Sequence, residues 1–357
     1  MKKWRPEETF EIENSGGRTN LPQKKIVKKL GSHFQLFSLQ SVNLTCTSFY
    51  NLPIFYFNLS IYLPMKKLFL LLFLGCITVT FLSSHNPQSY SRLLTEECYI
   101  SCYSTEIREQ FKLEAQNESF SALHPLPRKY ELAHTAGKRI TFKAADGTEA
   151  FGYEIKSAQP SNQWLFVIQE WWGLNNNIIR EAEEYATALG NVNVLALDMY
   201  DGKVATTPKE AMELVGSAKT ERLEQIVLGA VQYAGSSSRI FTIGWCFGGM
   251  WSLQSSLLAG KQAAGCVMYY GRPENNLEKL KTLQCDVLGI FGTLDKSPTP
   301  EVVRKFEADM QTVGKKLSLH FYEAGHGFAN PSNPGYQEAF TADARQKSLS
   351  FIRERLR

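Results

Sequence analysis

The stretch that decides the fold is RIFTIGWCFGG, residues 239–249. The run RIFTIG has the apolar composition of a buried strand, and a helical pattern begins at about residue 247. Gly244, Cys246 and Gly248 therefore occupy a strand–turn–helix of the form G-x-C-x-G, which is the nucleophile elbow with cysteine in place of serine. We expect glycine two positions to either side of Cys246, because larger side chains would collide with the neighbouring strand and helix.

Cys246 has two interpretations in this turn. At the N-terminus of a helix, the helix dipole and the free N–H groups favour a thiolate and an incoming oxyanion, so the residue is a candidate nucleophile. A free cysteine can also be a small buried apolar residue in a glycine-rich turn. The residues that follow the other strands decide between the two.

Short apolar runs alternate with longer amphipathic stretches around the elbow. Continuous apolar strands separated by helices predict an α/β fold, with a mostly parallel sheet covered on both faces. Active sites of such sheets form at the carboxyl ends of the strands. After a hairpin around residues 144–148, we expect strands at 164–169, 192–197, 239–244, 265–270, 285–291 and 317–323, and helices at about 176–189, 208–235, 247–260, 300–313 and 336–355.

A cysteine nucleophile in this turn needs a histidine base and an acid that orients it, in the chain order nucleophile, acid, histidine. His326 follows the last expected strand in a loop, whereas His134 precedes the hairpin and His320 lies within a strand. Asp295 follows its strand into a loop, whereas Asp286 opens the same strand at the opposite edge. We therefore predict Asp295 as the orienting acid and His326 as the base.

Glu170 ends the strand WLFVIQ at the same predicted edge. Its carboxylate can face the elbow, so either Glu170 or His326 is a candidate acceptor of the thiol proton. The alternative is a solvated glutamate that caps a helix. The backbone N–H groups of Trp171 and Phe247 are the predicted oxyanion hole.

The segment that begins at Met65, MKKLFLLLFLGCITVTFLSSHNPQ, has two lysines before a 15-residue apolar run. This run is shorter than the roughly 20 residues of a membrane-spanning helix and is typical of an export signal. Cleavage, lipidation at Cys76 and an uncleaved anchor stay open, and Phe73 stands where a lipidation motif usually has leucine. We expect a leader outside the mature protein (1–64), a signal peptide or N-terminal membrane anchor (65–85), a linker or irregular cap (86–135) and the catalytic domain (136–357). The protein is then exported, to the periplasm or the cell envelope.

The charge distribution argues against nucleic acid as a partner. The net charge is +4, but residues 1–64 hold 8 Lys and Arg against 4 Asp and Glu, and the rest of the chain holds 31 of each. No basic stripe remains to bind phosphates. The seven cysteines fit neither paired CxxC motifs nor a dense disulfide framework. Cys98 and Cys102 are candidates for one disulfide or part of a metal site, or are two unrelated cysteines.

Several separated blocks of the chain resemble one known family. They are QEWWG at 169–173 with Asn175 and Arg180, DMY at 198–200, GWCFGG at 244–249, YYG at 269–271, Gly292 with Asp295, and EAGHGFA at 323–329. In these blocks the segment 138–355 resembles the dienelactone hydrolase family of α/β-hydrolases. The resemblance implies a sheet of about eight strands, a Cys-Asp-His triad at Cys246, Asp295 and His326, and a glutamate, Glu170, that restrains the thiol until substrate binds. It also implies hydrolysis of an ester or lactone through a thioester acyl-enzyme, as in carboxymethylenebutenolidase, with no metal and no cofactor.

The chain departs from this family four residues after His326. Family members have an arginine there that helps to hold the substrate carboxylate, and this chain has Asn330, which argues against dienelactone itself as the substrate. Aromatic residues near strand ends suggest the pocket, and we predict substrate contacts at Trp172, Tyr200, Phe328 and Asn330. A non-catalytic exported binding protein on the same fold is the alternative function, and a redox role for Cys246 is a third.

Overall fold

The computed structural model describes residues 109–111, 113–132 and 135–356. The expected leader (1–64) and export segment (65–85) lie outside these residues, as do residues 86–108 of the expected linker with Cys98 and Cys102. Within the described ranges, no helix combines the length and the apolar character that crossing a membrane requires.

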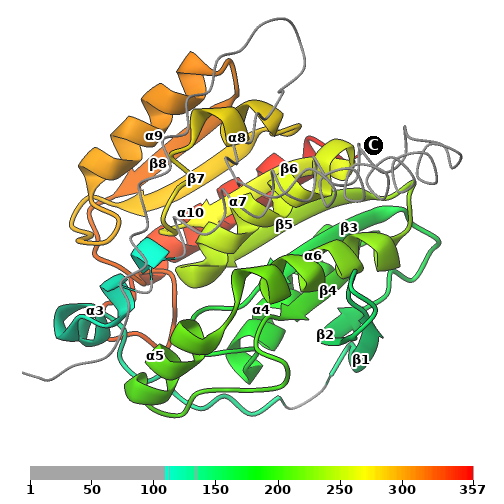
Figure 1. Cartoon of the computed structure of the whole chain (residues 1–357), viewed down its shortest axis with the longest axis horizontal. Helices are drawn as coiled ribbons and strands as arrows, with labels where there is room; N and C mark the ends of the chain where they lie inside the picture. Colours follow the sequence, from blue (N-terminus) through cyan, green and yellow to red (C-terminus); the bar gives the residue numbers. More distant parts are fainter. Residues whose placement is uncertain (1–108, 112, 133–134, 357) are drawn as a thin grey trace, which may run out of the picture. The chain divides into compact units, whose positions relative to one another are not determined.

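Eight strands of the described chain form one sheet in the order β1-β2-β4-β3-β5-β6-β7-β8 (Figure 1). The β1–β2 and β2–β4 pairs are antiparallel, and all other neighbours are parallel. The prediction of an α/β fold with a mostly parallel sheet of about eight strands is therefore confirmed. The strands are β1 (Lys138–Lys143), β2 (Glu149–Ile155), β3 (Gln163–Ile168), β4 (Asn193–Asp198), β5 (Arg239–Trp245), β6 (Ala263–Tyr269), β7 (Val287–Gly292) and β8 (Leu317–Tyr322).

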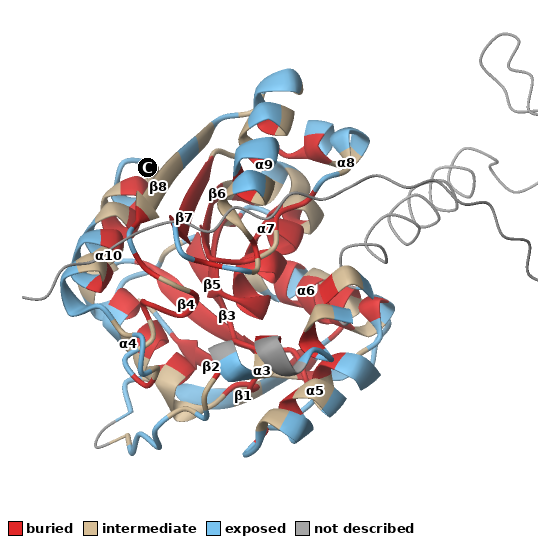
Figure 2. Cartoon of the chain, turned by 90° about the vertical axis from the view of Figure 1, so that its left-hand side faces the viewer, coloured by how far each residue is buried: buried red, intermediate tan, exposed pale blue. Residues whose placement is uncertain are grey.

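Helices cover both faces of this sheet. Figure 2 shows α4 and α10 on one side and α6, α7 and α9 on the other, with buried strands between them. Every residue of β3, β4 and β7 is buried, as expected for strands covered twice. The helices are α3 (Glu118–Leu123), α4 (Asn176–Leu189), α5 (Pro208–Ser217), α6 (Thr220–Ala234), α7 (Phe247–Ala259), α8 (Leu277–Thr282), α9 (Pro300–Thr312) and α10 (Glu338–Arg353), with a short 3-10 helix, η1 (Gly260–Gln262).

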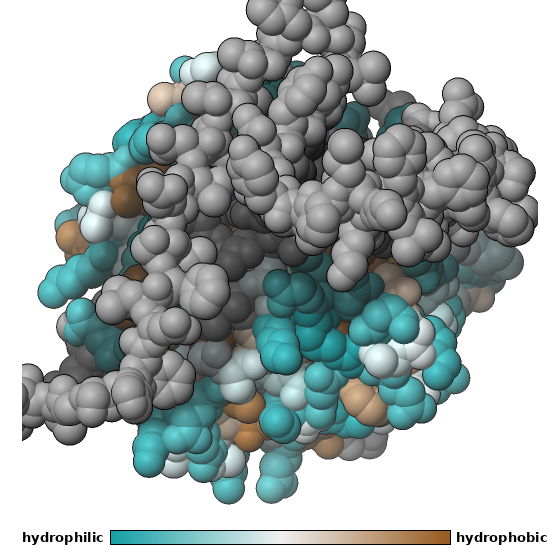
Figure 3. Space-filling model, viewed as in Figure 1, coloured by the Kyte–Doolittle hydropathy of each residue, from teal (hydrophilic) through white to brown (hydrophobic). Residues whose placement is uncertain are grey.

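The outer surface contrasts with this interior. On the face drawn in Figure 3, the described surface that can be seen is largely hydrophilic, and its apolar residues are scattered. Most apolar side chains of the fold are buried in the two interfaces between the sheet and its helices, and this packing holds the strand ends in place.

The expected helix at 208–235 is wrong, because the chain forms two helices there. Ala218 and Lys219 have extended backbone angles, and they separate α5 from α6. The preceding Gly216-Ser217 pair has low helix propensity, which favours an end at this point. The apolar spacing continues through the break and conceals it in the sequence.

Two glycines allow β5 to turn into α7. A Cβ at Gly244 would overlap the carbonyl oxygen of Gly248, and a Cβ at Gly248 would overlap the carbonyl oxygen of Ile168 in β3. The expectation that larger side chains collide here is confirmed. The first turn of α7 can therefore lie directly against two strands, and this contact sets the position of Cys246.

We predict that Gly244→Ala destabilises the fold by about 3 kcal/mol or more, because the new methyl group meets backbone that cannot move independently. Gly216→Ala is the matched control, since a Cβ there has open space and its effect stays within about 1 kcal/mol of wild type. Urea denaturation of the three proteins measures the difference. A Gly244→Ala protein as stable as wild type would contradict the packing argument.

Candidate active site

Cys246 lies at the carboxyl edge of the sheet, between β5 and α7. Its backbone has φ 55° and ψ −118°, a conformation that costs a non-glycine residue about 1–3 kcal/mol. Its N–H donates to the carbonyl of Tyr269, and its own carbonyl accepts from the N–H of Met250, both at 3.1 Å. The side chain is 2% exposed. Burial raises the pKa of the thiol, although the nearby His326 favours the thiolate.

Asp295 and His326 come together from the loops after β7 and β8. Nδ1 of His326 donates to Oδ2 of Asp295 at 2.8 Å, and both side chains are almost completely buried. The other oxygen of Asp295 accepts the N–H of Ser297 at 2.9 Å. Burial disfavours imidazolium, but the Asp295 carboxylate and the Cys246 sulfur outweigh it and raise the pKa of His326 well above its usual value. Nε2 of His326 lies within 4.8 Å of Sγ of Cys246.

Glu170 follows β3 and is buried beside the same edge. The side-chain amide of Asn330 donates to Oε2 of Glu170 at 2.7 Å, and the Asn330 oxygen accepts two bonds from Ser332. The Asn330 side chain therefore links Glu170 to Ser332. Burial raises the pKa of Glu170 to about 7, although His326 and Asn330 both favour its charged form. Glu170 acts electrostatically on Cys246 as well.

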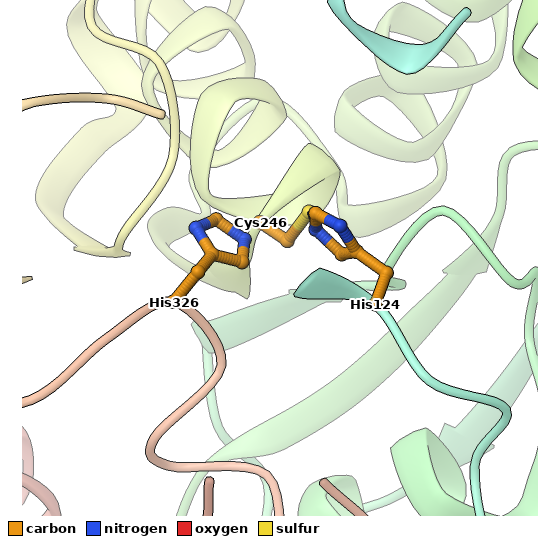
Figure 4. A group of neighbouring side chains, drawn as sticks. All are labelled: His124, Cys246 and His326. Carbon is orange, nitrogen blue, oxygen red and sulfur yellow. The ribbon is translucent and has the colours of Figure 1, made fainter. Parts of the chain in front are cut away.

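A second histidine reaches Cys246, which the sequence analysis missed. Nε2 of His124 is 3.2 Å from Sγ of Cys246, and Nδ1 donates to the carbonyl of Phe120 at 2.7 Å. Figure 4 shows both rings beside the cysteine, and the ring centroids of His124 and His326 lie 4.5 Å apart. Burial, together with the charge of His326, lowers the pKa of His124 well below its usual value. His124 is thus a neutral imidazole whose Nε2 accepts a hydrogen bond from the Cys246 thiol.

His124 belongs to the described part of the expected linker or cap, residues 109–132, here named the cap segment. The segment includes α3 and contacts the site through aromatic rings. Phe111 lies 5.8 Å from the ring of Phe247, and Phe120 stacks on His124 at 4.0 Å. Phe120 and His124 stand four residues apart, so they share one helical face. The four-residue spacing of Phe120 and His124 was the one feature of the sequence that could have indicated a packed helix here. The polar residues around it favoured the interpretation as a linker.

The remaining predicted site residues are buried near this edge. The ring of Trp171 lies 4.9 Å from His124 and 5.0 Å from Trp172. Tyr200 lies 5.4 Å from the ring of Phe247. Phe328 packs on Tyr270 at 5.6 Å, and Tyr270 lies 4.9 Å from His326. The two predicted oxyanion residues, Trp171 and Phe247, thus come from opposite sides of the elbow.

Several polar atoms around the sulfur lack hydrogen-bond partners within the described ranges. They are Nε2 of His326, the hydroxyl of Tyr270 and the indole nitrogen of Trp171. Buried polar atoms are nearly always paired, because an unpaired one costs about 1–3 kcal/mol. Unpartnered buried polar atoms also occur elsewhere in the described chain, but these three lie close to Cys246, where a polar ligand could bind.

The sheet, the elbow and the residues gathered at its rim define an α/β-hydrolase. The sequence model of the dienelactone hydrolase family matches residues 151–356, so the chain belongs to this family and is a dienelactone hydrolase-like hydrolase. The matched residues include Cys246, Asp295 and His326, whereas the cap segment with His124 lies outside the match.

Curated relatives agree with this assignment. Carboxymethylenebutenolidase 1 of Cupriavidus pinatubonensis is 26% identical over 60% of this chain and 95% of the relative. Carboxymethylenebutenolidase of a Pseudomonas species is 31% identical over 58% of this chain and 92% of the relative. Among solved structures, a dienelactone hydrolase-like promiscuous phosphotriesterase from metagenomic libraries has a TM-score of 0.53 at 20% identity, covering 62% of this chain and all of that one, which shows a shared fold.

We predict that Glu170 makes stability depend on pH. Its pKa is about 7 in the fold against an ordinary value of 4.5, so the folded state holds a proton that the unfolded chain releases in this window. Stability therefore falls as the pH rises from about 4.5 to about 7, by up to about 3 kcal/mol from this group. Glu170→Gln lacks this loss. Urea denaturation at pH 5 and pH 8 gives the free energy of unfolding of both proteins, and the variant should be more stable relative to wild type at pH 8 than at pH 5. The same difference in free energy of unfolding at both pH values would contradict the prediction.

Proposed function

We propose that the protein hydrolyses carboxylic esters or lactones with Cys246 as the nucleophile, His326 as the base and Asp295 as the residue that orients the base. The observation that carries the proposal is the buried His326–Asp295 pair at 2.8 Å, whose unpartnered Nε2 lies beside the sulfur of the elbow. Asp295 accepts a hydrogen bond from Nδ1 of His326. In the neutral form of His326, Nε2 therefore carries the lone pair that can accept a proton.

The proposed reaction has two steps. In the first, the thiol proton passes to Nε2 of His326, Sγ of Cys246 attacks the carbonyl carbon, and the C–O bond breaks as the alcohol leaves with that proton. The product is a thioester on Cys246. In the second, His326 takes a proton from water, the hydroxide attacks the thioester, and the acid leaves as the proton returns to the sulfur.

Two further roles belong to the proposal. The N–H groups of Trp171 and Phe247 hold the oxyanion, and hydrogen bonding from the N–H of Phe247 to the sulfur favours the thiolate. Glu170 is the second candidate acceptor of the thiol proton, because its pKa of about 7 lets it exchange a proton at neutral pH.

The surroundings of the site bear on the substrate class. A shallow hollow beside Glu170 and Asn330 has room for little more than a water molecule, and its lining does not include Cys246, so it does not define the size of the acyl group. Trp172, Tyr200 and Phe328 supply apolar walls near the rim. Residue 330 is an asparagine and not the arginine of the family, so it offers no positive charge to a dienelactone carboxylate. Its side chain instead donates a hydrogen bond to Glu170. The sulfur itself is closed off, and substrate entry requires the cap segment to move.

We predict that Cys246→Ala abolishes the burst of p-nitrophenol from p-nitrophenyl acetate and lowers kcat/KM by about 10³-fold or more. Asp295→Asn lowers it by about 10²-fold or more, because the imidazole loses its orientation. His320→Ala is the matched control, since this histidine lies within β8 and outside the site. Stopped-flow absorbance measures the burst, and intact mass spectrometry detects acetyl on wild type and not on Cys246→Ala.

The same assay with a panel of lactones tests the alternative function. If wild type and Cys246→Ala hydrolyse every compound at the same slow rate, the catalytic proposal is wrong. A folded protein that binds these compounds without turnover would be a non-catalytic binding protein on a hydrolase fold.

We also propose that the protein is exported, on the strength of the charged and apolar segment that begins at Met65. Cell fractionation should recover the chain outside the cytoplasm, with an N-terminus beyond residue 64. Replacing Lys66 and Lys67 by glutamate should retain it in the cytoplasm. A wild-type chain found intact from Met1 in the cytoplasm would overturn the proposal.

A further inference from the structure

We propose that Cys246, His124 and His326 form a binding site for one zinc-like divalent cation, and that a cation held there blocks hydrolysis. The site would be built from three separate parts of the chain: the cap segment, the elbow and the loop after β8. The proposal concerns metal binding, so it does not depend on the hydrolytic mechanism. Its functional consequence rests on the proposed role of Cys246.

The distances between the donor atoms suit such a cation. Nε2 of His124 lies 3.2 Å from Sγ of Cys246, and all three donor atoms lie within 4.8 Å of one another. Tetrahedral zinc with ordinary Zn–S and Zn–N bonds places its sulfur and nitrogen ligands about 3.5 Å apart. A small inward movement of His326 would therefore complete three ligands and leave the fourth position open.

Both imidazoles are already oriented as metal ligands. In each ring Nδ1 donates to a fixed acceptor, the Phe120 carbonyl for His124 at 2.7 Å and the Asp295 carboxylate for His326 at 2.8 Å. Each ring therefore directs Nε2 toward the sulfur, and a bound cation would take the place of any proton that Nε2 of His326 carries (Figure 4). Metal-binding histidines commonly use their second nitrogen in this way, which fixes the tautomer and raises the basicity of the ligand.

An independent observation points to a ligand at this place. Nε2 of His326 has no hydrogen-bond partner within the described ranges, although its side chain is only 3% exposed. A cation that binds Nε2 would remove the cost of this unpaired acceptor. His124 is not needed to orient either member of the His326–Asp295 pair, yet its ring lies 4.5 Å from the ring of His326 and its Nε2 contacts the same sulfur.

The local charges and donor types select the class of cation. The thiolate formed when Cys246 loses its proton to bind the metal, together with the Asp295 carboxylate bonded to His326, would neutralise a divalent charge in this buried place. Two imidazoles and one thiolate suit zinc and similar borderline cations, whereas Mg²⁺ and Ca²⁺ prefer oxygen ligands. Bound there, the cation would hold the sulfur lone pair and Nε2 of His326, the two groups that the proposed hydrolysis needs.

Titration of the chelator-treated full-length protein tests the site directly. We expect one Zn²⁺ per chain in competition with a chromophoric chelator, and a thiolate-to-metal charge-transfer band when Co²⁺ is added instead. Cys246→Ser should remove the band, and His124→Ala should weaken Zn²⁺ binding at least tenfold. His320→Ala and Cys285→Ser are matched controls that leave both readings unchanged, because neither residue belongs to the cluster.

A measurement on wild type alone guards against variants that fail to fold. Zn²⁺ should protect Cys246 from iodoacetamide, as read by peptide mass spectrometry, and EDTA should restore the labelling. Absence of stoichiometric binding, or equal Zn²⁺ affinity in wild type and folded His124→Ala, would overturn the proposal.

An assay of hydrolysis tests whether the bound cation blocks the enzyme. The metal-free enzyme should hydrolyse p-nitrophenyl acetate, and one equivalent of Zn²⁺ should suppress the rate until EDTA is added. If the metal-free protein shows no hydrolysis while the Co²⁺ band still depends on Cys246 and His124, the proposed function fails and the metal site stands. Hydrolysis that persists at full Zn²⁺ occupancy would refute the blocking role.

Discussion

The close approach of α7 to strands β3 and β5 is the contact on which the site depends. Gly244 and Gly248 permit it, because a Cβ at either position would overlap neighbouring backbone. The strained backbone of Cys246 follows from this contact, and the hydrogen bonds of its N–H and carbonyl hold it. The carboxyl edge of the parallel sheet then brings the loops after β3, β7 and β8 around one sulfur atom. Local sterics and sheet topology thus fix the site before any charge interaction contributes.

Burial then sets the protonation states at this edge. The pKa of the Cys246 thiol and the pKa of the Glu170 carboxyl are both raised, so burial favours their neutral forms. His326 is the exception, because the Asp295 carboxylate offsets the desolvation of the imidazolium. The resting site therefore combines a protonated thiol with a histidine made basic by its partner, and a ligand that alters the desolvation would shift the proton between them.

The sequence predicted most of the fold and the parts of the site that lie next to strand ends. Cys246, Asp295 and His326 each follow a strand of the parallel part of the sheet, and parallel strands bring such positions to one edge whatever their separation along the chain. His124 escaped prediction because no strand positions it. The cap segment that carries it is held by the packing of Phe111 and Phe120 and by Glu114, which accepts hydrogen bonds from Ser297 and Arg272. The bond between Asn330 and Glu170 escaped for a related reason, since it joins two loops whose relative position is a tertiary property.

The division between the family-matched region and the cap segment separates two properties of the site. Residues 151–356 contain Cys246, Asp295 and His326, so all three groups of the proposed mechanism lie in the family-matched region. The cap segment precedes that match, yet it supplies the atom that contacts the sulfur at 3.2 Å and the rings that close over it. Likeness to the relatives therefore supports a common reaction chemistry, whereas access to the nucleophile and its resting hydrogen bond are set by the cap segment. In the proposed mechanism, substrate competes with His124 for the sulfur, so part of the binding free energy displaces a packed imidazole before Sγ can attack the carbonyl.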